Sequence, residues 1–421
     1  MTHKMLLLAA VSLLAAPMLA GCAQNGTNTG NDKTLEFKLG SMMPLTGALN
    51  SLGPDMENGA KLAVEQVNDA NVGIKITATY KDDKTTDSAA ITGTFNQLAS
   101  AGVTGIVGPC CSGVTAAVLD LAKQEQIVVA SPSATSPTLT EKDNGGYFLR
   151  ISPSDAVQGK VLAKLIADDG VKTVGIIIVN NAYGNGLTAV MKQALTTSVP
   201  PVAVVPGHEA KYEENAAGDM SSQVTTVCAA PKPDAIVLVA YVDDGAAALK
   251  AMQTQGCLAG TKVYGSEGVY NEQLATKAGK GPDDKFLAAG VKGTNPETAN
   301  LSRFNAVFNA SYGHTPALYA AESYDGVMYL ALAALAAKSV EGKDIAAKLP
   351  DILNAPGTKY TADRFKDAAE AVKKGDDIDF DGYAHAFAFD PAKREPTTGI
   401  YSYWQVQDDG TMKIIATGKS A

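Results

Sequence analysis

Two patterns of apolar residues alternate along the chain from residue 35 onward. Some short runs are apolar at nearly every position, and the run at 173–179 contains three consecutive isoleucines. A strand of this kind must be covered on both faces, as in a parallel sheet. Between these runs lie segments such as 55–68, where apolar residues recur on one helical face. The expected strands are 35–41, 74–80, 103–107, 127–130, 147–151, 173–179, 202–205, 235–240 and 286–290.

The alternation of strands and helices predicts an α/β fold with two doubly wound parallel-sheet lobes. Seams are expected near residues 150–153 and 290–296. A length of 421 residues fits two or three globular units of roughly 100 to 200 residues each. The later part of the chain predicts a long helix at 318–338 and short strands at 384–389, 399–406 and 411–415.

The first 34 residues predict an export signal and a tether. A lysine precedes an apolar run at 5–19, which is typical of a secretory signal and shorter than the roughly 20 residues of a membrane span. The run ends in Leu-Ala-Gly-Cys, which resembles the lipobox of bacterial lipoproteins, so we expect Cys22 to be acylated. A plain cleaved signal is the alternative. Residues 23–34 are polar and predict a flexible tether to the membrane.

Four cysteines remain beside Cys22, in a protein expected outside the cytoplasm, where disulfides form. Cys228 and Cys257 each lie near the end of an expected helix, on either side of the strand at 235–240, and we expect them to pair. Cys110 and Cys111 are adjacent, and a ring closed between neighbours is strained. We expect these two to stay as separate buried thiols.

Charge and motif content narrow the possible functions. With a net charge of −9, the chain lacks the clustered Lys and Arg that nucleic acid requires as a partner. Four histidines make a His-rich metal site implausible. Residues 184–189 fit the dinucleotide pattern G-x-G-x-x-A, but four residues separate Gly184 from the end of the strand, where the fingerprint needs a tight turn. We expect no cofactor and no metal.

Candidate ligand-binding residues follow the ends of several expected strands, where open α/β sheets bind ligands. Ser112 stands at the start of a helix, whose N-terminal N–H groups suit a carboxylate. Glu267 is a single acid between a serine and a glycine. The other candidates are Ser133, Thr135, Tyr183 and Tyr241. Together they offer hydroxyl and amide donors and one carboxylate, which complements a zwitterion.

Each candidate also has a purely structural interpretation. Ser112 is equally suited to cap its helix, and Ser133 and Thr135 to form a turn. The tyrosines are suited to pack in the core, and a single glutamate such as Glu267 to lie in solvent. An exported hydrolase with Cys111 or Ser112 as its nucleophile is a further alternative, but it needs a positioned histidine base.

The order and spacing of several motifs resemble one family. The motifs are GSM at 40–42 with TG at 46–47, VGPCCSGVT at 107–115, ASPSATSPTLT at 130–140, NAYGNGL at 181–187, Tyr241, and YGSEGV at 264–269. They resemble the Leu/Ile/Val-binding proteins of bacterial branched-chain amino acid ABC uptake systems, which are type I periplasmic binding proteins. The resemblance runs from about residue 35 to residue 415.

The resemblance implies a role for each candidate. Ser112 and Thr135 would bind the carboxylate of an aliphatic amino acid. Ser133 would offer its carbonyl to the ammonium, and Glu267 would pair with it. The two candidate tyrosines would come from the second lobe and close the site. At Leu52, some family members place an aromatic residue against the ligand side chain.

The resemblance also implies the domain organisation and the partners. Lobe 1 would comprise 35–152 and 292–395, and lobe 2 would comprise 153–291 and 396–421, joined by three hinge crossings. The closed form would deliver its ligand to an ABC permease, with the binding protein itself a monomer. A receptor of the same fold, which senses an amino acid or a small amide and signals to another protein, is the main alternative.

Overall fold

The computed structural model describes residues 34–84, 87–214, 218–384 and 388–420. These residues are organised around two β-sheets, with two further pairs of short strands. The expected signal, Cys22 and nearly all of the tether lie outside the described residues, so the lipid anchor stays a prediction.

The first sheet has five parallel strands in the order β2-β1-β3-β4-β5. Their bounds are β1 Leu35–Met43, β2 Ile74–Asp82, β3 Gly105–Val107, β4 Val128–Ser131 and β5 Phe148–Arg150. Every residue of β3 and β4 is buried. This explains why these runs are apolar throughout, because helices cover both of their faces.

The helices of the first lobe lie on both faces of this sheet. The chain moves in opposite directions from β1 to β2 and from β2 to β3, so right-handed crossovers place α1 on one face and α2 and α3 on the other. The long helix α10 packs against α1, and its residues 320–335 are all buried. The bounds are α1 Gly53–Ala70, α2 Ser88–Ser100, α3 Ser112–Glu125, η1 Pro137–Leu139, α9 Leu301–Tyr312, α10 Ala320–Ala337, α11 Gly342–Ile352, η3 Ala362–Arg364 and α12 Phe365–Lys374.

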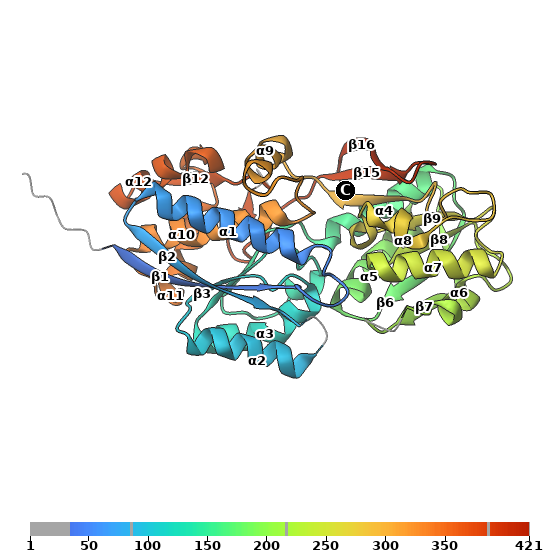
Figure 1. Ribbon diagram of the computed structural model, residues 1–421, viewed down its shortest axis with the longest axis horizontal. Coiled ribbons are helices and arrows are strands. Elements are labelled where there is room, and N and C mark those ends of the chain that lie inside the picture. The colour runs from blue at the N-terminus through green and yellow to red at the C-terminus, as the bar shows by residue number, and fades with distance from the viewer. Residues whose placement is uncertain (1–33, 85–86, 215–217, 385–387, 421) are drawn as a thin grey trace, which may run out of the picture. The chain divides into compact units, whose positions relative to one another are not determined.

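The second sheet has seven strands in the order β16-β15-β10-β9-β8-β6-β7. The four strands β7, β6, β8 and β9 are parallel and continue in parallel to β10, whereas β15 and β16 are antiparallel to their neighbours. The bounds are β6 Thr173–Val179, β7 Ala203–Tyr212, β8 Ala235–Val239, β9 Lys262–Gly265, β10 Lys292–Pro296, β15 Tyr401–Val406 and β16 Met412–Lys419. The predicted α/β fold with two lobes is therefore confirmed (Figure 1).

The remaining elements are short or cover the second sheet. The helices of the second lobe are α4 Asp155–Asp168, α5 Ala182–Thr197, α6 Ser221–Val227, α7 Val242–Thr254, η2 Glu267–Val269 and α8 Gln273–Ala278. The short strand pairs are β11 Thr358–Thr361 with β12 Ile378–Asp381, and β13 Phe389–Asp390 with β14 Glu395–Pro396.

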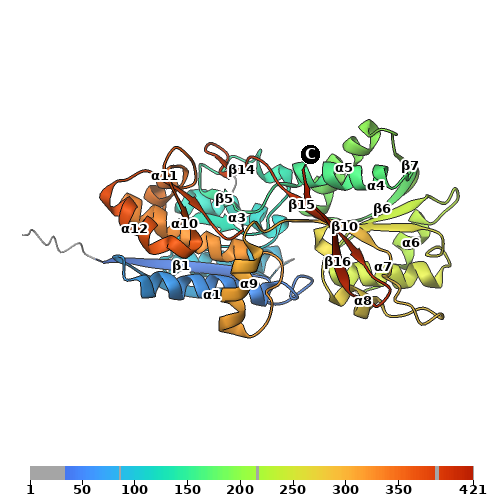
Figure 2. The ribbon, with the colours of Figure 1, turned by 90° about the horizontal axis from the view of Figure 1, so that it is seen from above.

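The described chain passes between the two lobes three times, as the hinge prediction requires (Figure 2). The crossings are residues 151–154 after β5, 297–300 after β10, and 397–400 after β14. The second and third are bonded to each other, since the Glu297 N–H donates to the Ile400 carbonyl at 2.8 Å. Strand β10, which the expected boundary at residue 292 assigns to lobe 1, pairs with β9 and β15 of the second sheet. The other lobe boundaries stay a prediction.

The expected strand at 286–290 is wrong. This apolar segment forms turns, in which the Ala289 N–H donates to the Phe286 carbonyl at 3.0 Å and Gly290 has φ of 84°. The strand that joins β9 and β15 is β10, just after it. Of the expected strand at 384–389, Phe389 alone belongs to a strand among the described residues, because 385–387 lie outside them.

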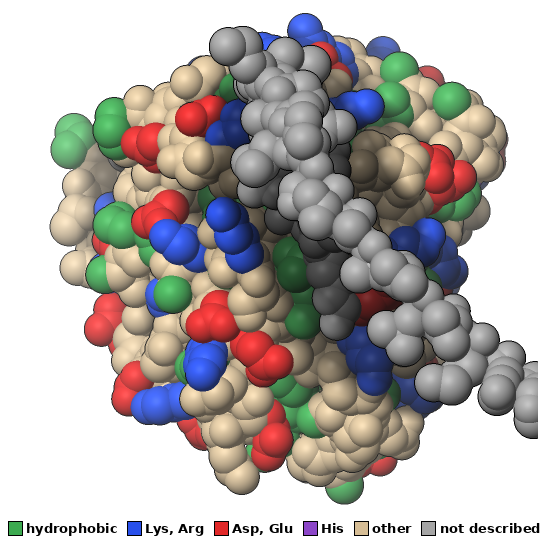
Figure 3. Space-filling view, turned by 90° about the vertical axis from the view of Figure 1, so that its left-hand side faces the viewer, with side chains coloured by type: hydrophobic (Ala, Val, Ile, Leu, Met, Phe, Trp, Pro, Cys, Tyr) green, Lys and Arg blue, Asp and Glu red, His purple; other side chains and the backbone are tan. Residues whose placement is uncertain are grey.

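The described surface shown in Figure 3 carries acidic and basic side chains interspersed with one another. Across the described parts of residues 34–420, no helix is long and apolar enough to cross a bilayer.

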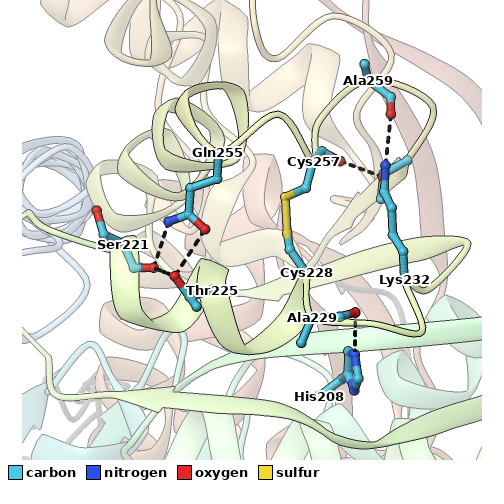
Figure 4. The surroundings of a disulfide bond; sticks show 10 residues. His208, Ser221, Thr225, Cys228, Ala229, Lys232, Gln255, Cys257 and Ala259 are labelled. Atoms are coloured by element: carbon cyan, nitrogen blue, oxygen red, sulfur yellow. Dashed lines mark hydrogen bonds between the residues drawn. A yellow bond between two sulfur atoms is a disulfide. The ribbon is translucent and has the colours of Figure 1, made fainter.

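The expected disulfide joins Cys228, at the end of α6, to Cys257, after the end of α7 (Figure 4). Hydrogen bonds of Gln255 also connect the ends of α6 and α7. Its amide donates to the Ser221 carbonyl at 2.9 Å and accepts the Thr225 hydroxyl at 3.1 Å. Cys110 and Cys111 are free and buried, as expected.

We predict that the double variant C228S/C257S unfolds at lower urea concentration than the wild type. The disulfide closes a loop with a sequence separation of 29, which by chain entropy contributes roughly 3 to 4 kcal/mol to the free energy of unfolding. Urea titration followed by circular dichroism measures the change. Ligand affinity should be unaltered, because neither cysteine lines the cavity described below. A midpoint that does not move on reduction or substitution would contradict the stabilising role.

Candidate functional site

Segments that follow strands of both sheets meet around one cavity. Its lining residues are Leu49, Leu52, Cys110, Cys111, Ser112, Ser133, Tyr183, Tyr241, Glu267, Gly268 and Tyr319. Five of the six predicted ligand-binding residues are in this set. Thr135 is the exception, and it lies buried just behind the wall. The convergence follows from topology, since parallel strands present their carboxyl ends at one edge of each sheet.

The start of α3 forms one wall of the cavity. Cys111 occupies the cap position and Ser112 is the first helical residue, so the interpretation of Ser112 as the N-cap is wrong. Its hydroxyl instead accepts the Ser136 N–H at 3.1 Å. The N–H groups in the first turn of a helix have no intrahelical acceptor, which leaves them available to an anion.

The β4–η1 loop, residues 132–136, forms the adjoining wall. The Ser133 hydroxyl donates to the Cys110 carbonyl at 2.6 Å, which joins this loop to the segment that precedes α3. The Thr135 carbonyl accepts the Asp155 N–H at 2.9 Å, at the first crossing. The predicted contact of Thr135 with the ligand therefore stays a prediction, since its side chain does not line the cavity.

Two tyrosines of the second lobe face this wall. Tyr183 lies in the first turn of α5 and Tyr241 caps α7, and their rings stack with centroids 5.8 Å apart. The Tyr183 hydroxyl donates to the Ser266 hydroxyl at 2.7 Å, and Asn181 donates to the Tyr241 hydroxyl at 2.9 Å. Both rings therefore pack, and both also line the cavity.

Glu267 is buried, so its interpretation as a solvated loop acid is wrong. It begins η2 directly after β9 and is 6% exposed. Burial raises the pKa of its carboxyl to about 7, although several hydrogen bonds oppose the shift. One of these comes from Gln158, whose amide donates to Oε2 at 2.6 Å and lies 3.2 Å from the Thr294 hydroxyl. Glu267 is thus held between α4 and β10.

A second acid lies beside it. Asp155 is fully buried, and it precedes Gln158 by three residues, on the same face of α4. Neither of its carboxylate oxygens has a hydrogen-bond partner of normal geometry among the described residues. Burial, and then the charge of Glu267, raise the pKa of Asp155 well above its ordinary value. Asp155 itself does not line the cavity, and Arg150 is the cation that opposes the rise of its pKa.

Tyr319 is the lining residue that sequence reasoning missed most clearly. It was expected inside the helix at 318–338, but it caps α10 with φ of 70°, which costs a residue with a side chain roughly 1 to 2 kcal/mol. Its buried hydroxyl has no hydrogen-bond partner among the described residues. Burial, Glu267 and Tyr183 raise its pKa. The strain and the unpaired hydroxyl make this residue a candidate contact for a ligand.

Further residues shape the cavity. Leu52, which the family resemblance had singled out, and Leu49, which sequence reasoning missed, give it apolar surface. Gly268 allows close approach, because a Cβ there would lie 2.4 Å from the Ala240 carbonyl oxygen. Gly186 of the G-x-G-x-x-A motif has a similar reason, since its Cβ would lie 2.5 Å from the Ser136 hydroxyl. The glycines of that motif serve packing.

The cavity holds about 30 Å³ of open space, roughly enough for two water molecules. A larger hollow of about 670 Å³ lies beside it, and Leu52 and Tyr319 line both. An organic ligand thus requires the walls of the cavity to move apart.

The two thiols in the wall are poor nucleophiles. Burial raises the pKa of both the Cys110 and the Cys111 thiols, which removes the thiolate that attack requires. Among the described residues, no histidine lines the cavity. The arrangement is suited to binding, with hydroxyl and N–H donors on one wall and the carboxyl of Glu267 on the other.

Comparison with known proteins gives the family. The family described as periplasmic binding protein matches residues 36–398. The chain belongs to this family. Its relatives include BraC3 of Rhizobium johnstonii, named as a Leu/Ile/Val-binding protein, which is 27% identical over 296 residues and is aligned over 65% of this chain and 77% of its own. The predicted resemblance to this group of binding proteins is confirmed.

Another relative spans more of this binding protein. BasB of Halobacterium salinarum, named as a substrate-binding protein of a chemotactic signal transduction system, is 26% identical over 392 residues and covers 90% of both chains. Among solved structures, LivJ of Streptococcus pneumoniae in complex with isoleucine has a TM-score of 0.73 at 21% identity, over 92% of this chain and 100% of its own. That likeness confirms the fold.

We predict that E267Q stabilises the ligand-free protein at high pH. The carboxyl pKa rises from 4.5 to about 7 on folding, so the folded state binds more protons and the wild type loses stability as pH rises through this window. The variant has no carboxyl to ionise at this position. Its free energy of unfolding should therefore exceed that of the wild type by about 3 kcal/mol above pH 7.

Urea unfolding at pH 5, 6 and 8 tests this. D244N is the matched control, since burial raises the pKa of Asp244 to about 6 and its stability difference from the wild type should change little above that pH. An E267Q advantage that is equal at pH 5 and pH 8 would show that Glu267 is not the titrating group.

Proposed function

We propose that this binding protein captures an aliphatic amino acid in the cavity between its lobes and releases it unaltered. The observation that carries the proposal is the buried Glu267, which faces hydroxyl and N–H donors across a small cavity with an apolar end. An amino acid zwitterion carries an ammonium group that can pair with Glu267 and a carboxylate that the hydroxyl and N–H donors can bind. BraC3, which is named as a Leu/Ile/Val-binding protein, and LivJ, whose structure was solved with isoleucine, support the same class.

The carboxylate would bind at the start of α3. The Ser112 segment offers N–H groups and the partial positive end of a helix of 14 residues, and the β4–η1 loop adds its hydroxyls. This wall belongs entirely to the first lobe, so a ligand can dock there first. Ser112 and Thr135 keep their predicted roles in this proposal.

The ammonium would bind between the two walls. Glu267 supplies the counter-charge from the second lobe and Ser133 a carbonyl from the first, and Tyr183 and Tyr241 bring the second lobe onto the ligand. Because the cavity is small, the lobes must separate to admit the ligand and rotate about the three crossings to enclose it. The ligand favours the enclosed state because its ammonium meets Glu267 only there.

The apolar end of the cavity would receive the side chain. Leu49 and Leu52 offer aliphatic surface, with the ring of Tyr319 beside them. This supports leucine, isoleucine or valine over charged amino acids.

The proposed cellular role is delivery to an ABC permease by a monomeric lipoprotein, acylated at Cys22 and facing the periplasm or the exterior. A receptor that signals to a partner protein is the second candidate. BasB favours it, because that relative covers 90% of this chain and is named for chemotaxis. Growth on leucine as nitrogen source and chemotaxis towards leucine, measured in a strain that lacks this protein, separate the two roles.

We predict that E267A weakens L-leucine binding by roughly 2 to 5 kcal/mol, because the ammonium would be buried without a counter-charge. Isothermal titration calorimetry with leucine, isoleucine and valine measures the change, and 4-hydroxybenzoate tests a carboxylate without an ammonium. D244N, a buried acid of the same lobe outside the cavity wall, should bind leucine as the wild type does.

Two outcomes would refute this ligand class. One is tight binding of leucine by E267A. The other is a wild type that binds 4-hydroxybenzoate and none of the three amino acids.

We predict that leucine affinity rises with pH between 5.5 and about 7 and then levels off. The ammonium requires ionised Glu267, whose pKa in the free protein is about 7, so each pH unit below this value weakens binding by up to about tenfold. Calorimetry in buffers of different ionisation enthalpy should detect proton release on binding at pH 6. E267Q should lose this dependence. A dependence that survives in E267Q and disappears in D155N would assign the proton to Asp155 instead.

A further inference from the structure

Arg150 is a fully buried cation that the proposed binding contacts do not use. It is the last residue of β5, next to the first crossing. Burial lowers the pKa of its guanidinium, and Glu395 acts most strongly in the opposite direction. A buried charge persists only where its surroundings compensate it.

Three hydrogen bonds from its guanidinium go to the segment that follows β4. Nη1 donates to the carbonyls of Ala134 and Ser136, at 3.0 and 2.9 Å. Nη2 donates to the Thr140 hydroxyl at 3.0 Å. The remaining nitrogen, Nε, lies 3.0 Å from the Glu395 carboxylate. One guanidinium thus holds three points of a single loop region.

The two carbonyls flank Thr135, and this fixes the direction of a backbone donor. In a trans peptide the N–H of one residue points opposite to the carbonyl of the residue before it. The hydrogen bond from Arg150 to Ala134 therefore aims the Thr135 N–H away from Arg150.

The neighbouring peptide units are held as well. The Ala134 N–H donates to the Ser131 hydroxyl at 3.1 Å, which aims the Ser133 carbonyl the opposite way. The Ser136 N–H donates to Ser112 in the cavity wall at 3.1 Å. Consecutive peptide units of the β4–η1 loop are thus oriented before any ligand arrives.

Glu395 connects this arrangement to the third crossing. It lies in β14 and accepts the Thr140 hydroxyl at 2.7 Å. The Arg150 N–H also donates to the Arg394 carbonyl at 2.9 Å. Hydrogen bonds therefore connect the loop to residues next to both the first and the third crossing.

We propose that Arg150 is a positioning residue for ligand recognition, which sets the backbone donors of the β4–η1 loop for the ligand carboxylate. The inference rests on the proposed function, since it concerns the carboxylate side of the same site. A lysine at this position keeps the charge but not the planar fork that reaches several acceptors at once.

The test compares L-leucine with leucinol, which has the same amine and side chain but no carboxylate. In R150K, leucine affinity should fall by at least about tenfold, while leucinol affinity should change less than about twofold. R394K is the matched control, because Arg394 lies just before β14 and its side chain donates to the Ala346 carbonyl at 3.1 Å, away from the loop. Its leucine-to-leucinol ratio should equal that of the wild type.

Two results would overturn the inference. An R150K protein with the wild-type ratio shows that the loop needs no guanidinium, and equal losses for both ligands show a general disturbance. A wild type that fails to prefer leucine over leucinol refutes the proposed function, and the inference with it. If circular dichroism shows R150K unfolded, E395Q takes its place, with an expected fall in the ratio of at least about threefold; an unchanged ratio then overturns the inference.

Discussion

The site depends on a carboxyl group that is removed from water where the two sheets converge. An isolated buried carboxylate is costly, and Glu267 has one side-chain amide, that of Gln158, within hydrogen-bond distance. Its burial raises its pKa, and Asp155 beside it makes full ionisation harder still. Under the proposed function, a ligand that brings its own positive charge offsets this cost, and this links binding to enclosure.

Other buried charges of the first lobe serve to hold backbone. Arg150 binds carbonyls of the β4–η1 loop, and Asp325 of α10 does the converse, since its two oxygens accept the N–H groups of Tyr383 and Ala384 at 2.8 and 2.7 Å. Both are fully buried. Irregular segments of this lobe thus obtain from ionisable side chains the hydrogen bonds that a helix or strand supplies to itself.

The sequence allowed most of the fold to be predicted, because buried parallel strands are continuous apolar runs. It failed where that signal was absent or misleading. Strand β10 reads Lys-Gly-Thr-Asn-Pro and carries no apolar run, whereas the apolar segment 286–290 just before it forms turns. The position of β10 is set by pairing with β9 and β15, which are distant in sequence. No local pattern contains that information.

The candidate site, too, was predicted where position in the sequence was enough and missed where it was not. Residues directly after strands were found, since topology alone brings those positions together. Tyr319 was missed because its role depends on a left-handed backbone conformation at the start of α10, in a stretch whose composition is typical of helix. Gln158 was missed because a glutamine within a helix looks like a surface residue. Thr135 was chosen for its position after β4, but it is buried and is not among the residues that line the cavity.

The threefold passage of the chain between the lobes has a consequence for its synthesis. All five strands of the first sheet lie before residue 151, yet α10, which covers one of its faces, is made only after most of the second lobe. The second sheet in turn waits for β15 and β16, which follow all of its other strands. A nascent chain therefore carries two unfinished apolar surfaces until β15 and β16 have been made, a state well matched to export before folding.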